Sequence, residues 1–208
     1  MEHAYELRST IRREVSIEVI PGHFATKNSH ISHFVDMYKI KCQLKEAKAA
    51  ARMFTDLLMG TPIESIISLD RMKMVGAYMA EFLSNGVSVS SRQNISVLSP
   101  EVTDGILILR DNVMQYVRGK RVLILTDSAT TGKSVHSIAD GVRYYGGYPV
   151  AIAAVFGGDF ESDLPVVKLF GLKDIPTYCS YSPLECPLCK KGVKVDAVVN
   201  SYGYSKIE

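Results

Sequence analysis

The stretch RVLILTDSATTGKSVHS, residues 121–137, carries side chains that could bind a phosphorylated ligand. Its Gly-Lys-Ser ending is that of a P-loop, but a P-loop needs a second glycine five residues before Gly132, where this chain has Asp127. An acidic side chain there would place a negative charge beside the phosphates. Lys133 and Ser134 are therefore not expected to act as a Walker lysine and serine, and a kinase or ATPase is a weak interpretation.

A different anion site is expected in the same stretch. The continuous apolar run 121–127 predicts a strand buried on both faces, and the pattern of 134–147 predicts the helix that follows it. Backbone N–H groups at a helix N-terminus favour a phosphate, and Asp127 could accept hydrogen bonds from sugar hydroxyls or hold a divalent cation through water. Together these features describe a ribose 5-phosphate site. The alternative is an ordinary turn with threonine caps and a surface Asp127.

Alternating strands and helices surround this motif. They predict a doubly wound α/β fold with a mainly parallel sheet, whose ligands bind at the carboxyl ends of the strands. The expected helices are 42–59, 74–86 and 134–147, and the expected strands are 63–70, 87–91, 95–99, 105–111, 121–127 and 149–158.

Composition narrows the class of protein. The chain has 208 residues, 47% of them hydrophobic, which is enough for one sizeable core. A net charge of +2, with both signs scattered, is unlike a nucleic-acid binder. No apolar run reaches the length of a membrane span or a signal-peptide core, so we expect a cytoplasmic protein without a membrane partner. The four cysteines are expected to be free thiols.

The segment VLILTDSATTGKS, residues 122–134, resembles the phosphoribosyl-diphosphate (PRPP) motif of type I phosphoribosyltransferases. The resemblance implies that Asp127 meets the ribose hydroxyls. It also implies a cradle for the 5-phosphate made of Ser128, Ala129, Thr130, Thr131, Gly132, Lys133 and Ser134. One departure is that Thr126 occupies the first of the two positions that are usually acidic.

The segment GHFATKNSHISHFVDM, residues 22–37, resembles the N-terminal part of orotate phosphoribosyltransferases, which forms a hood over the base. The matching positions are Phe24, Lys27, Ser32, Phe34 and Asp36. The resemblance implies that Lys27 reaches the substrates and that Phe34 packs near the base. The alternative is an amphipathic strand with a surface lysine, in which the histidines His23, His30 and His33 are exposed loop residues.

The segment SLDRMKMVGAYMAEFL, residues 68–83, occupies the place of the pyrophosphate loop in this resemblance. It implies that Asp70, Arg71 and Lys73 contact the substrate, with Lys73 and Arg71 facing the leaving pyrophosphate. The alternative is a charged surface loop. Residues 90–112 correspond to a mobile loop that is rich in cations in the family, yet they contain only Arg92 near the start and Arg110 near the end.

Two further features concern the ends of the sheet and of the chain. In the family an arginine that binds the orotate carboxylate follows the strand after the PRPP helix, but residues 152–162, IAAVFGGDFES, contain none.

Residues 186–208 resemble the C-terminal tail of bacterial orotate phosphoribosyltransferase-like proteins and begin with C-P-L-C. The pair Cys186 and Cys189 is half of a zinc site that Cys179 or a partner subunit would have to complete, and the alternative is a turn with buried thiols.

The resemblance as a whole implies one phosphoribosyltransferase domain over residues 1–208, with a core of about 40–177 and a hood from 1–39 and 178–208. It implies transfer of 5-phosphoribose from PRPP to orotate, with Mg²⁺ on the PRPP and Asp127, Lys73 and Arg92 as the catalytic group. The expected assembly is a homodimer. The alternatives are the same fold acting on a purine or another base, and a PRPP-binding regulator without catalysis.

Overall fold

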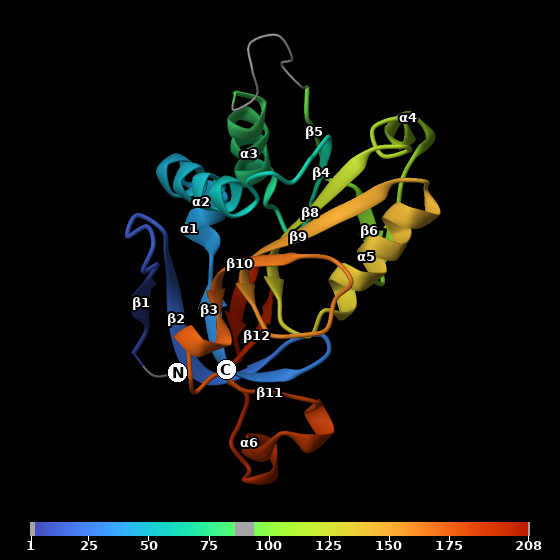
Figure 1. The fold of residues 1–208 in the computed structure, drawn as a ribbon. Coiled ribbons are helices and arrows are strands. Elements are labelled where there is room, and N and C mark those ends of the chain that lie inside the picture. Colours follow the sequence, from blue (N-terminus) through green and yellow to red (C-terminus); the bar gives the residue numbers. More distant parts are fainter. Residues whose placement is uncertain (1–2, 86–93, 208) are drawn as a thin grey trace.

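Strand β8, which carries Thr126 and Asp127, is the middle strand of a five-stranded parallel sheet in the computed structural model (Figure 1). The structure describes residues 3–85 and 94–207. The strands occur in the order β10-β9-β8-β4-β5, and every pairing is parallel. Their bounds are β4 (Ser65–Ser68), β5 (Ser96–Leu98), β8 (Arg121–Ala129), β9 (Tyr148–Gly157) and β10 (Val166–Gly171).

Helices cover both faces of this sheet, which explains the continuous apolar run of β8. Leu123 and Leu125 point into one core with α2 and α3, whereas Val122 and Ile124 point into another core with α5. Each fully buried side chain of this kind stabilises the fold by about 1.5–3 kcal/mol. The main helices are α1 (Tyr38–Cys42), α2 (Leu44–Leu57), α3 (Lys73–Asn85) and α5 (Lys133–Tyr144). The predicted doubly wound α/β fold is confirmed.

The predicted helix 42–59 is divided in the structure. Cys42 ends the short helix α1, and Gln43, in an extended conformation, separates it from α2. This break turns the chain, so that α1 leads from the second sheet toward the helical layer (Figure 1). Lys41, in α1 two residues before the break, lies at the ends of the parallel strands, as described below.

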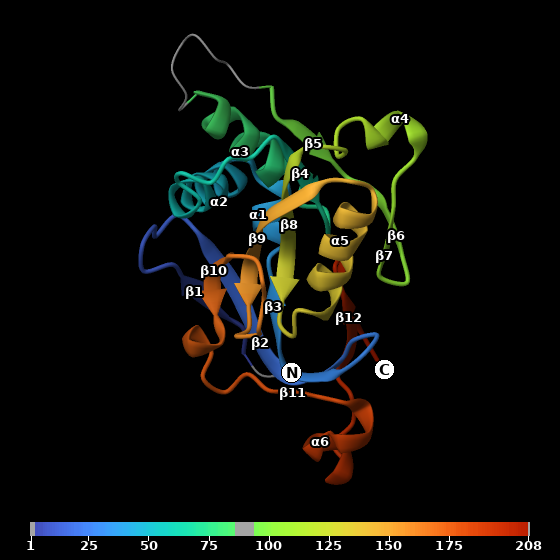
Figure 2. The same cartoon turned by 45° about the vertical axis from the view of Figure 1, so that its right-hand side comes forward.

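A second sheet is built from the two ends of the chain. It has six strands, in the order β11-β3-β2-β12-β13 with β1 beside β2, and is antiparallel except where β12 joins β2. The strands are β1 (Tyr5–Arg8), β2 (Ser16–Ala25), β3 (His30–Asp36), β11 (Ser180–Tyr181), β12 (Ala197–Asn200) and β13 (Gly203–Lys206). Figure 2 shows this sheet below the carboxyl ends of the parallel strands, with the short helix α6 (Pro187–Lys190) beneath it.

The predicted strand 105–111 is shorter and lies elsewhere than in the parallel sheet. It forms β7 (Ile106–Ile108), which pairs only with β6 (Glu101–Thr103) as a hairpin, and helix α4 (Asp111–Met114) follows it. The hairpin packs on α5, where Leu107 approaches Gly141 closely. The predicted strand 87–91 lies outside the described residues. Within the described part of the chain, no helix combines the length and apolar character needed to cross a membrane.

Candidate active site

Two acidic side chains lie together where β4 and β8 end. Because the strands are parallel neighbours, their carboxyl ends meet at one edge of the sheet. Asp70 follows β4, and its Oδ2 accepts a hydrogen bond of 2.6 Å from the hydroxyl of Thr126. The next residue, Asp127, is only 5% exposed. The alternative interpretation of Asp127 as a surface residue is therefore wrong.

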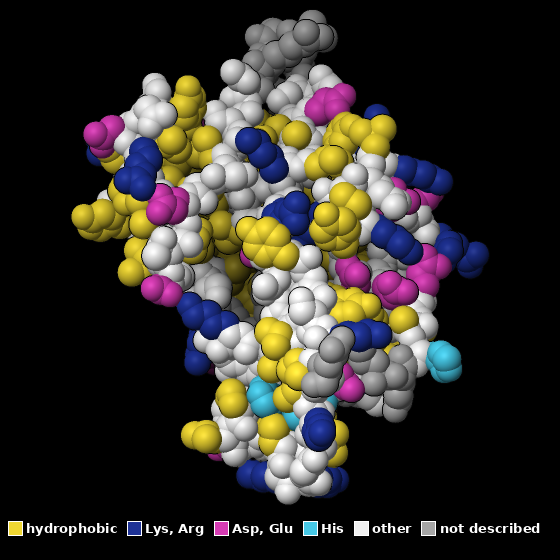
Figure 3. All heavy atoms as spheres, turned by 180° about the vertical axis from the view of Figure 1, so that it is seen from behind, with side chains coloured by type: hydrophobic (Ala, Val, Ile, Leu, Met, Phe, Trp, Pro, Cys, Tyr) yellow, Lys and Arg dark blue, Asp and Glu magenta, His cyan; other side chains and the backbone are white. Residues whose placement is uncertain are grey.

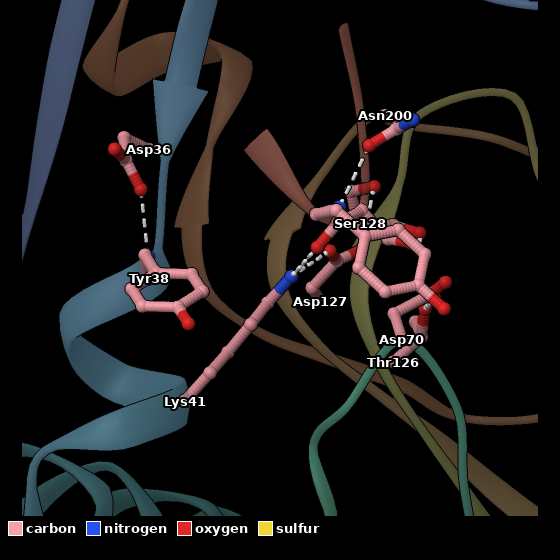
Figure 4. A network of polar contacts seen from close by, with 10 residues as sticks. Asp36, Tyr38, Lys41, Asp70, Thr126, Asp127, Ser128 and Asn200 are labelled. Atoms are coloured by element: carbon pink, nitrogen blue, oxygen red, sulfur yellow. Dashed lines mark hydrogen bonds and ion pairs between the residues drawn. The ribbon is translucent and has the colours of Figure 1, made fainter. Parts of the chain in front are cut away.

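Lys41 neutralises Asp127. Its Nζ lies 2.6 Å from Oδ2 of Asp127, and the two side chains are only 6% and 7% exposed (Figure 4). Asp127 Oδ1 accepts a second hydrogen bond from the hydroxyl of Ser128, and Lys41 also donates to the backbone oxygen of Ser201. A buried ion pair needs such additional partners to offset the loss of hydration. The result is a fixed carboxylate at the entrance to the turn that follows β8.

The carboxyl group of Asp70 has an unusual pKa. Burial raises it most, the negative charge of Asp127 raises it further, and the Thr126 hydrogen bond and Lys41 only partly oppose these effects, so that its pKa is about 6 instead of 3.8. Two carboxylates with one nearby lysine leave this edge of the sheet with an excess of negative charge. Such an environment suits hydroxyl groups that donate hydrogen bonds, or a cation.

The turn between β8 and α5 has the form of an anion site. Gly132 is the N-cap of α5 with a φ of +76°, a conformation that favours glycine, and the first helical turn has no side-chain cap. Its N–H groups are therefore available to a ligand. Ser128, Thr131, Lys133 and Ser134 are exposed along the same turn.

The loop after β9 holds this turn tightly from one side. A Cβ atom on Gly158 would lie 2.1 Å from the backbone oxygen of Thr130, and one on Gly132 would lie 2.5 Å from the ring of Phe160. Lys168 extends from β10 along this loop, donating to the Gly158 oxygen at 2.9 Å and pairing with Asp159. A lysine is thus present beside the loop that lacks the arginine expected from the family pattern.

The loop between β4 and α3 is strained. Asp70 and Arg71 both have positive φ values, 48° and 66°, which are rare for residues with side chains and often occur at functional sites. The Arg71 guanidinium lies over the rings of Tyr38 and Tyr202, at 5.7 and 5.1 Å from their centres. Lys73, the first residue of α3, is exposed.

The C-terminal tail closes the same region. The turn after β12 brings the Ser201 oxygen to Lys41 and the Tyr202 ring to Arg71, and Asn200 accepts a hydrogen bond from the backbone of Tyr202. Figure 4 shows Asn200, on this C-terminal turn, in the same close-up as Lys41, Asp127 and Ser128. Segments more than 100 residues apart in the chain therefore form one polar site at the carboxyl ends of the strands.

The two predicted hood residues differ in their surroundings. Phe34 is 8% exposed and packs against Phe24 and Tyr204 in the small core of the second sheet. Lys27 is exposed, and its Nζ pairs at 2.8 Å with Asp104 in the β6–β7 turn. Because both partners of this pair are mostly in solvent, the interaction is weak and leaves Lys27 able to exchange its partner.

Comparison with known proteins decides the family. No protein-family model matches the chain. The orotate phosphoribosyltransferase of Sulfurimonas denitrificans is 30% identical over 187 residues, which cover 84% of this chain and 89% of that protein. The chain belongs to the orotate phosphoribosyltransferase family. Another member, from Thermotoga maritima, is 24% identical over 184 residues, covering 86% of this chain and 90% of that protein.

Solved structures agree with this at the level of the fold. The orotate phosphoribosyltransferase of Aeropyrum pernix has a TM-score of 0.55 with 15% identity, covering 85% of this chain and 93% of that chain. A phosphoribosyltransferase from Corynebacterium diphtheriae has a TM-score of 0.52 with 18% identity, covering 74% of this chain and 91% of that chain. The fold is therefore that of the type I phosphoribosyltransferases, to which the orotate phosphoribosyltransferase family belongs.

The structure brings some of the predicted site residues of this orotate phosphoribosyltransferase family member together. Asp70 and Asp127 share one edge of the sheet, and the turn between β8 and α5 begins two residues after Asp127, where β8 ends at Ala129. Lys27 lies on a separate loop, and Arg92 is outside the described residues. The roles of these residues remain predictions.

Sequence reasoning missed three residues, namely Lys41, Lys168 and Tyr202. In the sequence Lys41 is one of several lysines near the start of a predicted helix. Nothing in the sequence links it to its partner Asp127, which is 86 residues away. Lys168 lies in an apolar strand, where an isolated lysine is unusual and could have been noticed. Tyr202 follows Asn-Ser and precedes glycine, which indicates a turn but not its position.

Proposed function

We propose that this protein is an orotate phosphoribosyltransferase, which transfers 5-phosphoribose from PRPP to orotate and releases orotidine 5′-phosphate and pyrophosphate. Its family membership supports this reaction, and one structural observation carries it. A buried carboxylate, Asp127, is fixed by Lys41 immediately before an exposed phosphate-binding turn at a helix N-terminus. This spacing matches a ligand that has a phosphate and vicinal hydroxyls on one sugar.

In this proposal the turn 128–134 binds the 5-phosphate. The N–H groups of the first turn of α5 donate to the phosphate oxygens, and the hydroxyls of Thr131 and Ser134 add further donors. Asp127 then accepts hydrogen bonds from the ribose hydroxyls. Lys41 is a positioning residue, because its ion pair with Asp127 orients the carboxylate.

The leaving pyrophosphate would face the β4–α3 loop. Arg71 and Lys73 supply positive charge there, and the stacking of Arg71 between Tyr38 and Tyr202 holds the guanidinium at the edge of the site. Arg92 remains a proposed catalytic cation. The bond from the anomeric carbon to the pyrophosphate oxygen breaks while a bond to a base nitrogen forms, with inversion. Positioning and charge neutralisation at an oxocarbenium-like transition state would supply the rate.

Mg²⁺ is expected to bind together with PRPP, and the carboxylate oxygens at the ends of β4 and β8 are suitable ligands for this ion. Mg²⁺ prefers oxygen ligands and binds through one or two carboxylates together with substrate phosphates. Asp70 and Asp127 offer such oxygens, and the pKa of Asp70 is raised first by burial and then by the negative charge of Asp127, which a cation would offset. When bound, the ion would neutralise the pyrophosphate oxygens.

Recognition of the base rests on the hood and on two lysines. Orotate is a planar anion, so it needs an apolar wall and a positive charge. Phe34 belongs to an aromatic cluster in the second sheet, and Lys27, between β2 and β3, and Lys168, in β10, are the proposed cations. Lys168 provides positive charge at the loop where the family pattern has an arginine. This observation favours orotate over a purine.

Three further features belong to the proposal. The two-sheet arrangement supports a core of about 40–177 and a hood from 1–39 and 178–208, within one domain. A homodimer in which a neighbouring subunit contributes loop cations is proposed from the family, and light scattering would test it. A cytoplasmic location is likewise proposed, and cell fractionation would test it.

The direct test is a panel of bases with PRPP and Mg²⁺. Loss of orotate absorbance is followed in one reaction, and pyrophosphate release is measured in parallel with hypoxanthine, guanine, adenine and uracil. We expect turnover with orotate and none with the other bases. Turnover with a purine instead would transfer the proposal to a purine enzyme. PRPP binding without turnover of any base would identify a regulator.

A further inference from the structure

Four potential metal ligands meet below the second sheet, away from the strand ends that form the candidate active site. They are His23 in β2, His30 at the start of β3, and Cys186 and Cys189 around α6. Their ligand atoms all lie within 4.8 Å of one another. Figure 3, seen from behind, shows histidine side chains among hydrophobic ones at the lower end of the molecule, where Figure 1 places α6.

We propose that these four residues form a structural Cys₂His₂ zinc site. The distances suit this metal. With Zn–S bonds of about 2.3 Å and Zn–N bonds of about 2.0–2.1 Å, a tetrahedral site separates two nitrogens by about 3.3 Å and a nitrogen from a sulfur by about 3.6 Å. His23 Nε2 and His30 Nδ1 are 3.0 Å apart. Three of the four nitrogen–sulfur distances are 3.5 Å from Cys186 to His23, 3.7 Å from Cys189 to His23, and 3.2 Å from Cys189 to His30.

The hydrogen bonds of His23 orient it as a metal ligand. Its Nδ1 lies 3.1 Å from the backbone oxygens of both Val193 and Lys194. Because carbonyl oxygens only accept, Nδ1 carries the proton and donates it, and Nε2 presents a lone pair to the other three ligands. Metal-bound histidines almost always donate their second ring nitrogen in this way. The His23 side chain is only 1% exposed, so this ligand and its hydrogen bonds are shielded from water.

The segment around the two cysteines needs such a link, because it has little core of its own. None of the four residues of α6 is buried, and Leu184 just before it is 92% exposed. Cys186, at 1% exposure, is the buried residue that attaches this segment to the hairpin β2–β3. A structural zinc ion contributes folding free energy directly where a core is missing. The site would therefore act as a clasp between the C-terminal segment and the hairpin.

This clasp also bears on the candidate active site. Beyond it, Asp196 accepts a hydrogen bond from the backbone of His23, and β12 pairs with β2. The chain then supplies Ser201 to Lys41 and Tyr202 to Arg71. A metal at the clasp would fix the starting point of the segment that closes the site.

The ligand set differs from the one expected from sequence. Cys179 was one of two candidates to complete the site, the other being a partner subunit, but it lies outside the four-residue group and its backbone N–H donates to Ser32. His23 is buried instead of being an exposed loop residue. The chain therefore contains four ligands for one ion without a partner subunit.

Metal content tests the proposal independently of any activity with orotate. The full chain, purified without a metal-binding tag, is analysed by mass spectrometry of elements. We expect about one zinc ion per chain, and a zinc content lower by about ten-fold or more in Cys186→Ser and His30→Ala. Cys179→Ser, the matched control, should retain the wild-type content. A wild-type protein that contains no zinc and does not take it up would overturn the proposal, as would variants that keep their zinc.

A second measurement covers the case in which the variants do not fold. Wild-type protein is stripped of metal with a chelator and titrated with Co²⁺. We expect the intense visible bands and the sulfur-to-metal charge-transfer absorption of tetrahedral thiolate coordination, both removed by added Zn²⁺, together with a higher thermal midpoint when Zn²⁺ is present. The weak spectrum of octahedral cobalt, or a disulfide between Cys186 and Cys189 in the isolated protein, would contradict the site.

Discussion

Replacing Asp70 by asparagine should make the protein more stable at neutral pH and less active. The pKa of Asp70 is about 6, raised by burial and by Asp127 from 3.8. Below about pH 4 the group is protonated in both folded and unfolded chains. Between about pH 4 and pH 6 the folded state binds more protons, so the free energy of unfolding falls as the pH rises, and above about pH 6 the loss is complete.

The size of this loss follows from the two pKa values. Each pKa unit corresponds to about 1.4 kcal/mol, so ionised Asp70 lowers the free energy of unfolding by up to about 3 kcal/mol at pH 8. Because the carboxylate interacts with Asp127, we expect a measured gain of about 1–3 kcal/mol for Asp70→Asn at pH 8. Asparagine has nearly the same shape and keeps an oxygen that can accept the Thr126 hydrogen bond. At pH 4 the gain should vanish.

Urea unfolding of the wild type and Asp70→Asn at several pH values measures this difference. Asp140→Asn is the control, because it removes the same charge from a side chain that is 74% exposed on α5. A stability difference for Asp70→Asn that is the same at pH 4 and pH 8 would refute the reasoning. So would an equal pH-dependent gain in the control.

Three further substitutions test other parts of the site. Lys41→Met leaves Asp127 buried without its counter-ion, and chemical denaturation should show that the free energy of unfolding falls by about 3–5 kcal/mol. A decrease of less than about 1 kcal/mol would contradict a buried ion pair. Gly132→Ala places a methyl group against Phe160 at a φ of +76°, and calorimetry should show PRPP affinity reduced by about ten-fold or more; unchanged affinity would remove the turn from the site. Lys168→Met should raise the KM for orotate by about ten-fold or more, because a charge-assisted hydrogen bond to orotate is lost. The KM for PRPP should stay unchanged. Equal increases in the two KM values would contradict a role of Lys168 in binding the base.

The parallel core was predictable because its signals are local. Residues 122–125 are apolar at consecutive positions, as a strand covered on both faces must be, and α5 follows with helical periodicity. The hairpin β6–β7 was placed less well, because three-residue strands carry little pattern. In β7, Leu107 is buried and Ile106 is exposed, which does not distinguish a hairpin on a helix from an edge strand of the sheet.

The candidate site was predictable only in part, because its partners are far apart in sequence. The turn after Asp127 has a recognisable order of residues, whereas Lys41 becomes part of the site only when α1 brings it to the end of β8. The zinc ligands illustrate the same limit. Cys186 and Cys189 are visible as a motif, but the histidines that complete the group precede them by more than 150 residues. Proximity in sequence instead suggested Cys179.

The most direct test of the central claim compares kcat/KM for orotate in three proteins, with saturating PRPP and Mg²⁺. These are the wild type, Asp127→Asn, which keeps the shape but removes the charge of the side chain that we propose binds the ribose, and Asp140→Asn as the exposed control. We predict orotate turnover by the wild type and the control, and a loss of about ten-fold or more in Asp127→Asn. Wild-type activity in Asp127→Asn, or no orotate turnover in any of the three, would contradict the account.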